Sequence, residues 1–246
     1  NAGLYLNKNE EYDPGVATKF AGLTANTSYS FKAKARNLRG VETAETGTVS
    51  TYTLAGIPGA PPGGTSTFTA VSTAGLTVSW SSGTVPGGYN PLGTTLYLVQ
   101  VSTMATFVPV AGSSQTYNLN AAVGGLAFAN TTHYAQVKAI NGDGVSTAYT
   151  NLGSTSTAAS MPGAPPIGVS TFTAISTFSL TVNWSSGSVL GGYNALNTTR
   201  YVVQISTMGT FLPVAGSSAT YNLNATFSTL NANATYFAQV KAINGD

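Results

Sequence analysis

The sequence predicts an all-β protein built from β-sandwich domains of about 100 residues, arranged one after another. Three observations predict this fold class. The chain contains two nearly identical segments of domain length, its apolar residues alternate along short runs, and segments rich in Gly, Pro, Asn and Ser separate these runs. No stretch carries the 3.6-residue apolar repeat of an amphipathic helix, so we expect no helices.

The internal repeat is the strongest of these signals. Ser66–Asn120 returns as Ser170–Asn224 with 41 of its 55 positions identical, and Trp80 and Trp184 lie 104 residues apart. The unit of a solenoid spans only ~20–50 residues, whereas ~100 residues is the size of a whole small sandwich. The repeat therefore predicts complete domains in tandem.

The copies divide the chain into three predicted domains. Residues 1–55 are expected to form the C-terminal part of one domain, residues 56–159 a complete domain, and residues 160–246 a domain without its last strand. The motif PGAPP, at residues 58–62 and again at 162–166, predicts short proline-rich links. We expect the sequence to be a segment of a longer array.

In chain order, the complete copy shows three clear alternating runs. LTVSW at 76–80 is followed by the turn-rich segment SSGTVPGGYNPLGTT, then by YLVQV at 97–101, the turn PVAGSS, and HYAQVKAI at 133–140. A period of two is typical of a half-buried antiparallel strand. It places Trp80, and Trp184 in the later copy, on the inward side of a strand, so both are expected in a core rather than on a sugar-binding surface.

These runs resemble the fibronectin type III family. The resemblance rests on the Trp of LTVSW, on TLYLVQVST, and on the late run, where the family has a corner tyrosine, alternating small or branched residues, Ala-x-Asn and a Gly turn. Tyr29 and Tyr236 hold the corner position in the first and third copies, and His133 holds it in the second, after a one-residue insertion near Phe128–Ala129. The resemblance implies an immunoglobulin-like sandwich and leaves function open.

Composition excludes several classes of partner and chemistry. Charged residues make up 7% of the chain, the formal net charge is +2 and there is no Cys, so we expect no nucleic-acid partner, thiol nucleophile or thiolate metal site. No apolar run approaches the ~20 residues of a membrane helix. His133, the one histidine, is interpreted as a corner residue that bonds the backbone, and Asp143 in NGDG as part of a Gly-rich turn. We expect no enzyme activity and no cofactor.

Exposed aromatic residues are the candidates for contact with a partner. Tyr89 and Tyr193 lie in the two Gly-Gly-Tyr-Asn loops, and Tyr134 and its counterpart Phe237 are expected to point outward from a strand. Such side chains suit an interface with carbohydrate or with a surface protein. A receptor-like binding module that uses these loops would lose binding when Tyr193 is replaced by Ala, without a change in melting temperature.

The distribution of charge indicates contact between neighbouring domains. Eleven of the sixteen charged residues lie before residue 55, which leaves five for the remaining 192 positions. Exposed strand edges are usually protected by charges. We therefore expect the neutral Ser/Thr faces to be covered, by neighbouring repeats, by self-association or by glycan.

These observations favour a structural or adhesive segment of a long extracellular or cell-surface protein of bacterial type, one that forms a fibre or filament. The alternative is a non-catalytic spacer between modules of a secreted carbohydrate-active enzyme. The length of the parent protein and the nature of its neighbouring domains would separate the two.

Overall fold

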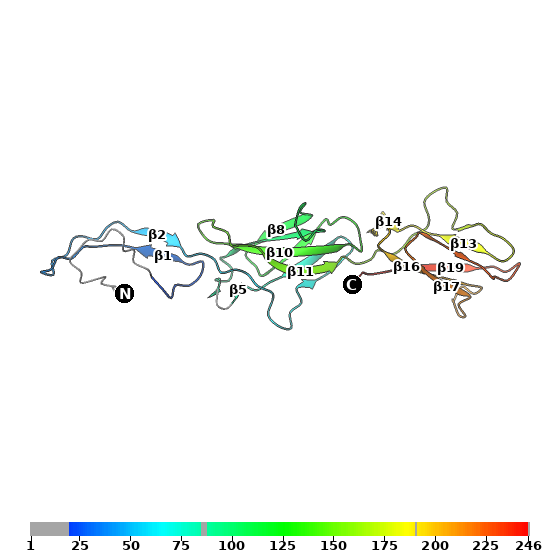
Figure 1. The fold of residues 1–246 in the computed structure, drawn as a ribbon, viewed down its shortest axis with the longest axis horizontal. Helices are drawn as coiled ribbons and strands as arrows, with labels where there is room; N and C mark the ends of the chain where they lie inside the picture. The colour runs from blue at the N-terminus through cyan, green and yellow to red at the C-terminus, as the bar shows by residue number, and fades with distance from the viewer. Residues whose placement is uncertain (1–19, 85–87, 190, 246) are drawn as a thin grey trace.

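The computed structural model describes residues 20–84, 88–189 and 191–245, and these form β-strands and loops without a helix. The predicted all-β fold class is confirmed. Strands gather in three groups that follow one another along the long axis of the molecule (Figure 1). We call them the first (1–55), second (56–159) and third (160–246) domains. The described residues contain no helix that could span a membrane.

The second domain is a sandwich of two antiparallel sheets. One sheet has the order β3-β4-β9 and the other β11-β10-β7-β8, with a short hairpin of β5 and β6 at one end. The strands are β3 (Phe68–Thr69), β4 (Gly75–Ser79), β5 (Gly83–Thr84), β6 (Gly88–Tyr89), β7 (Leu96–Ser102), β8 (Gly112–Thr116), β9 (Asn120–Gly124), β10 (Thr132–Ile140) and β11 (Thr150–Ser156).

The core of the second domain follows from the period-two pattern. In β10 the residues at 133, 135, 137 and 139 are buried and those between them are partly buried. They meet the inward residues of β4, β7 and β9, and Trp80 packs against Tyr97 with ring centroids 5.7 Å apart. Alternation thus buries one face of each sheet between the two layers.

The third domain repeats this arrangement with one strand fewer among its described residues. Its sheets have the orders β12-β13-β18 and β17-β16-β19, with the hairpin β14-β15. The strands are β12 (Phe172–Thr173), β13 (Leu180–Asn183), β14 (Gly187–Ser188), β15 (Gly192–Tyr193), β16 (Arg200–Ser206), β17 (Gly216–Thr220), β18 (Asn224–Phe227) and β19 (Phe237–Ile243).

The described part of the first domain is one antiparallel pair, β1 (Ser28–Phe31) and β2 (Val49–Tyr52). Phe20 packs against Phe31 with ring centroids 5.3 Å apart, and the loop beyond the pair carries the ion pairs Lys32–Glu45 and Lys34–Glu42. The acidic residues of the sequence at positions 10, 11, 13 and 246 lie outside the described residues.

Candidate functional site: the interdomain junctions

At each of the two junctions, one asparagine of the earlier domain inserts its side chain into the domain that follows. Asn26 and Asn130 occupy the same place before the corner residue of their domains, and both have a positive φ, 43° and 53°. Asparagine tolerates this left-handed backbone better than most residues. Both side chains are almost fully buried, with exposed fractions of 5% and 7%, although they lie at the ends of domains.

At the first junction Asn26 uses both ends of its amide. Its Nδ2 donates to Thr95 Oγ1 over 2.7 Å, and its Oδ1 accepts from the backbone N–H of Gly142 over 2.9 Å. Thr95 is itself completely buried and donates its hydroxyl to the carbonyl of Pro91. Every polar group of this buried set is therefore paired, which is the condition for burying it without a large penalty.

The second junction reproduces the same bonds one repeat later. Asn130 Nδ2 donates to Thr199 Oγ1 over 3.0 Å, and Asn130 Oδ1 accepts from the N–H of Gly245 over 2.7 Å. Thr199 donates in turn to the carbonyl of Ala195. We call the set Asn26–Thr95–Gly142 and its copy Asn130–Thr199–Gly245 the junction clamps.

The links between domains are bonded to the domain that follows them. Asn90 accepts from the N–H of Gly56 over 2.6 Å and donates to its carbonyl over 2.8 Å, and Asn194 makes the same two bonds with Ser160 over 2.7 and 2.9 Å. The PGAPP segments continue this attachment, since Gly59 and Gly163 form bridges with Ser81 and Ser185. These links are parts of the sandwich rather than free tethers.

The first junction has additional contacts through the NGDG turn. Asp143 Oδ2 accepts from the N–H of Tyr52 over 2.8 Å and from Thr51 Oγ1 over 2.9 Å. A Cβ on Gly142 would lie 2.4 Å from the ring of Tyr52, so this ring packs against a position that only glycine can occupy without rearrangement. The turn interpretation of NGDG misses this second role as an interdomain contact.

The predicted core and corner residues occupy defined places. Trp80 and Trp184 lie in the cores of their domains. Tyr29 Oη accepts from the N–H of Thr24 over 3.0 Å, and Tyr236 Oη accepts from the N–H of Asn231 over 2.9 Å. Each corner tyrosine thus bonds the backbone five residues before it.

His133 bonds the backbone differently from the corner tyrosines. It is completely buried, and its Nδ1 lies 2.8 Å from the carbonyl oxygen of Thr131. Because a carbonyl only accepts, Nδ1 carries the proton, and Nε2 is buried without a hydrogen-bond partner among the described residues. Burial lowers the pKa of His133. No group of His, Asp and Glu that could hold a metal ion occurs in the described part of the chain.

The predicted contact residues do not form one site. Tyr89 and Tyr193 lie on separate hairpins and are 58% and 47% exposed, Phe237 is exposed at the start of β19, and Tyr134 is only partly buried within β10. The structure brings none of them against another. Tyr134 is therefore less accessible to a partner than the other three residues, although we expected its side chain to point outward.

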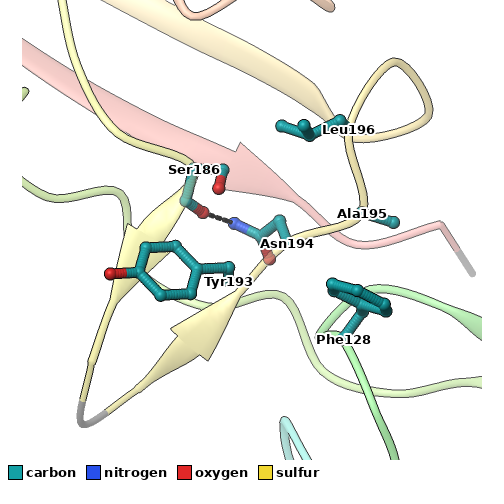
Figure 2. A pocket seen from close by; sticks show the side chains of 6 residues that line it. All are labelled: Phe128, Ser186, Tyr193, Asn194, Ala195 and Leu196. Atoms are coloured by element: carbon teal, nitrogen blue, oxygen red, sulfur yellow. Dashed lines mark hydrogen bonds between the residues drawn. The ribbon is translucent and has the colours of Figure 1, made fainter. Parts of the chain in front are cut away.

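Tyr193 borders an apolar groove at the second junction. The groove encloses about 530 Å³ and is lined by residues of two domains: Phe128 from the second, and Ser186, Tyr193, Asn194, Ala195 and Leu196 from the third. Figure 2 shows the rings of Phe128 and Tyr193 on either side of β15, with Asn194 and Ala195 on the loop that follows this strand. The second copy carries its one-residue insertion near Phe128–Ala129.

Sequence reasoning did not identify the junction clamps. Asn26 bonds residues 69 and 116 positions away, and Asn130 bonds residues 69 and 115 positions away. Pairs so far apart leave no local pattern in the sequence. One signal was present. The dipeptide Ala-Asn precedes the corner residue in all three copies, at Asn26, Asn130 and Asn233, although nothing in the sandwich itself requires an amide there.

Many solved structures are similar to this chain, and two of them are described here. The first, "Crystal structure of chicken CNTN1 FN1-FN3 domains", matches at 16% identity and a TM-score of 0.29 and covers 90% of this chain and 71% of that chain. The second, a two fibronectin type-III domain segment from chicken tenascin, matches at 15% identity and a TM-score of 0.42 and covers 77% of this chain and 92% of that chain.

No family model matches the sequence, and no curated protein matches it. The sheet orders and the repeated cores show what the fold is. In its fold, the chain is a tandem of fibronectin type III-like β-sandwich domains.

Proposed function

We propose that this chain is a stiff segment of a structural or adhesive array at a cell surface or in an extracellular fibre, of bacterial type. The observation that carries the proposal is the repetition of the junction clamp, with the same three residue types at both junctions. A repeated junction gives each domain the same relation to its neighbour, which is what an extended rod needs.

The clamps favour one orientation between neighbours over a range of orientations. A buried hydrogen bond contributes about 0.5–1.5 kcal/mol when made, and leaving its partners buried and unpaired costs about 1–3 kcal/mol. Rotating one domain away from the next would expose or break the Asn130 bonds and the bridge between Ala129 and Asn194. Because the links are bonded to the following domain, they allow less motion between domains than a free tether would.

The surface of the second and third domains suits association with neighbours. It carries few charged residues and many hydroxyl and amide groups, and self-repulsion between copies is therefore weak. We propose neighbouring repeats or other copies of the chain as the first partners. Tyr89, Tyr193 and Phe237 supply exposed aromatic surface for carbohydrate or a surface protein.

The test is to remove one clamp and measure the shape of the molecule. Asn130→Ala deletes the amide at the second junction, and Asn233→Ala is the matched control, because Asn233 has the same corner position and a positive φ of 51° but is exposed. Small-angle scattering of the full chain should show a wider distribution of lengths for Asn130→Ala and an unchanged one for Asn233→Ala. Equal distributions for all three proteins would contradict the proposal.

A further inference from the structure

The second and third domains each carry a loop with an exposed apolar tip. The side chains of these tips are Met104, Val108 and Val110 between β7 and β8, and Met208, Leu212 and Val214 between β16 and β17. We call them the second-domain tip and the third-domain tip. Their central residues, Val108 and Leu212, are 72% and 76% exposed. Single exposed apolar residues are common on protein surfaces, whereas a group of them marks a surface of contact.

Hydrogen bonds hold each tip in one shape. Ser206 is completely buried, and its Oγ donates to the carbonyl of Pro213 over 2.7 Å and accepts from the N–H of Met208 over 3.0 Å. Ser102 makes the same two bonds over the same distances at the second-domain tip. A surface that is already ordered loses little conformational entropy when it binds.

The groove at the second junction suits an apolar occupant. The side-chain amide of Asn194 is bonded to the backbone through both its oxygen and its nitrogen, and the N–H of Ala195 donates to the carbonyl of Ala129. The polar groups of this part of the lining are therefore paired within the chain. A volume of about 530 Å³ lies within the range of about 300–1,000 Å³ that is typical of ligand pockets, so aliphatic side chains can enter.

The sides of the groove are open even where the turn after the late strand is present in full. In the second domain the turn after β10 is complete, and Tyr89 and Leu92 are still 58% and 69% exposed. Their counterparts at the groove, Tyr193 and Leu196, are 47% and 62% exposed (Figure 2). Phe128, which the second domain contributes to the groove, is 64% exposed. Such a turn therefore leaves this apolar surface accessible.

We propose that the apolar tip of one copy of this chain docks in the junction groove of another copy. Neither surface contains a charged residue, and the groove is continuous with the domain junction through the bridge between Ala129 and Asn194. An apolar anchor that fills a pocket commonly forms the centre of a protein interface. The inference rests on the proposed array function and deepens it, because it names the surfaces through which copies meet.

The contact joins two different surfaces, so it is heterologous. Each copy has both a groove and tips, and a contact of this kind can continue from one copy to the next without closing. This is the type of association from which a fibre grows.

The experiment compares the natural 246-residue chain with three variants by sedimentation velocity, at concentrations up to about 1 mM. Phe128→Ser removes one side of the groove, and the double variant Val108→Ser with Leu212→Ser removes the centre of both tips. Ile167→Ser is the matched control, because this exposed isoleucine belongs to neither surface. All four side chains are exposed, so the melting temperatures should stay close to that of the natural chain.

The natural chain and Ile167→Ser should show the same rise of the sedimentation coefficient with concentration. Phe128→Ser and the double variant should each associate at least about tenfold more weakly, because each loses apolar surface that the contact buries. An equimolar mixture of these two variants should form one-to-one complexes, since one supplies intact tips and the other an intact groove.

Three results would each overturn the proposal: a natural chain that stays monomeric over the whole range, variants that associate as strongly as the natural chain, or a mixture that does not associate. The junction clamps are tested separately, because the scattering of Asn130→Ala is measured in dilute solution, where copies do not meet. Failure of association would leave the scattering result unchanged.

Discussion

The corner residue shows how one position can be filled in two chemically opposite ways. Tyr29 and Tyr236 accept a backbone N–H through the phenol oxygen, whereas His133 donates its Nδ1–H to the carbonyl of Thr131. The histidine can do so because the shorter ring brings a donor to a carbonyl two residues before it. Its Nε2 is left buried and unpartnered among the described residues, so the neutral ring is the form the fold accommodates.

His133 should make the stability of the second domain depend on pH. Burial lowers its pKa in the folded state below the ordinary value of about 6.5, so near and below that pH the unfolded chain binds more protons than the folded one. The free energy of unfolding should therefore fall as the pH drops through this value. Denaturant unfolding of the full chain at pH 7.5 and 5.5 measures the difference.

The variant His133→Tyr is the control for this prediction. Tyrosine restores the side chain of the sister corners and does not titrate in this range, so the fall in stability of the second domain between the two pH values should disappear. A variant that keeps the same pH dependence as the natural chain would show that another group is responsible.

Thr199 should be the most sensitive hydroxyl of the second junction. It accepts from Asn130 and donates to Ala195, and it is completely buried. Thr199→Val keeps the shape and leaves the amide of Asn130 without this acceptor, which should cost about 1–3 kcal/mol in the coupled unfolding of the second and third domains.

The neighbouring Thr198→Val provides the matched comparison. Thr198 is exposed and makes one long bond to the carbonyl of Ala195, so its replacement should change stability by less than about 0.5 kcal/mol. Thermal or denaturant unfolding of both variants checks the pair. Similar effects at the two positions would mean that the clamp contributes little.

At the scale of elements, β11 is the strand whose contribution can be measured most directly. It closes one edge of its sheet and brings Leu152 into the core. Leu152→Ala should lower the free energy of unfolding of the second domain by about 2–5 kcal/mol. Leu196→Ala, at a residue that is 62% exposed, should have little effect. A loss below about 1 kcal/mol for Leu152→Ala would show that β11 is only loosely attached.

Strands with clear alternation could be predicted from the sequence, and short ones could not. The runs at 76–80, 97–101 and 133–140 correspond to β4, β7 and β10, because burial on one face imposes a period of two. The hairpins β5-β6 and β14-β15 have two residues per strand and are set by glycine. A Cβ on Gly83 would lie 2.0 Å from the carbonyl oxygen of Gly88, so close pairing fixes this element.

The candidate site was harder to predict than the fold. Tyr193 could be proposed from its loop, but its place beside Phe128 depends on how two domains meet. In the sequence, Asn90 and Asn194 look like ordinary loop residues. In the structure, each makes two hydrogen bonds to the backbone of a link residue, Gly56 or Ser160. Contacts between domains join residues far apart in sequence, and no periodicity reports them.

In the whole molecule, the junctions rather than any single domain set how the domains are arranged. The three groups of strands lie in a row in Figure 1, and the chain beyond β19 returns to the second junction, where Gly245 bonds Asn130. The same polar set therefore connects neighbouring domains at both junctions.

Residual dipolar couplings of the backbone amides in the full chain measure whether neighbouring domains hold one orientation. We expect the second and third domains to share one alignment tensor in the natural chain and to have different tensors in Asn130→Ala. Separate tensors for the two domains in the natural chain would contradict this expectation, because the junction clamp would then not hold the domains together in solution.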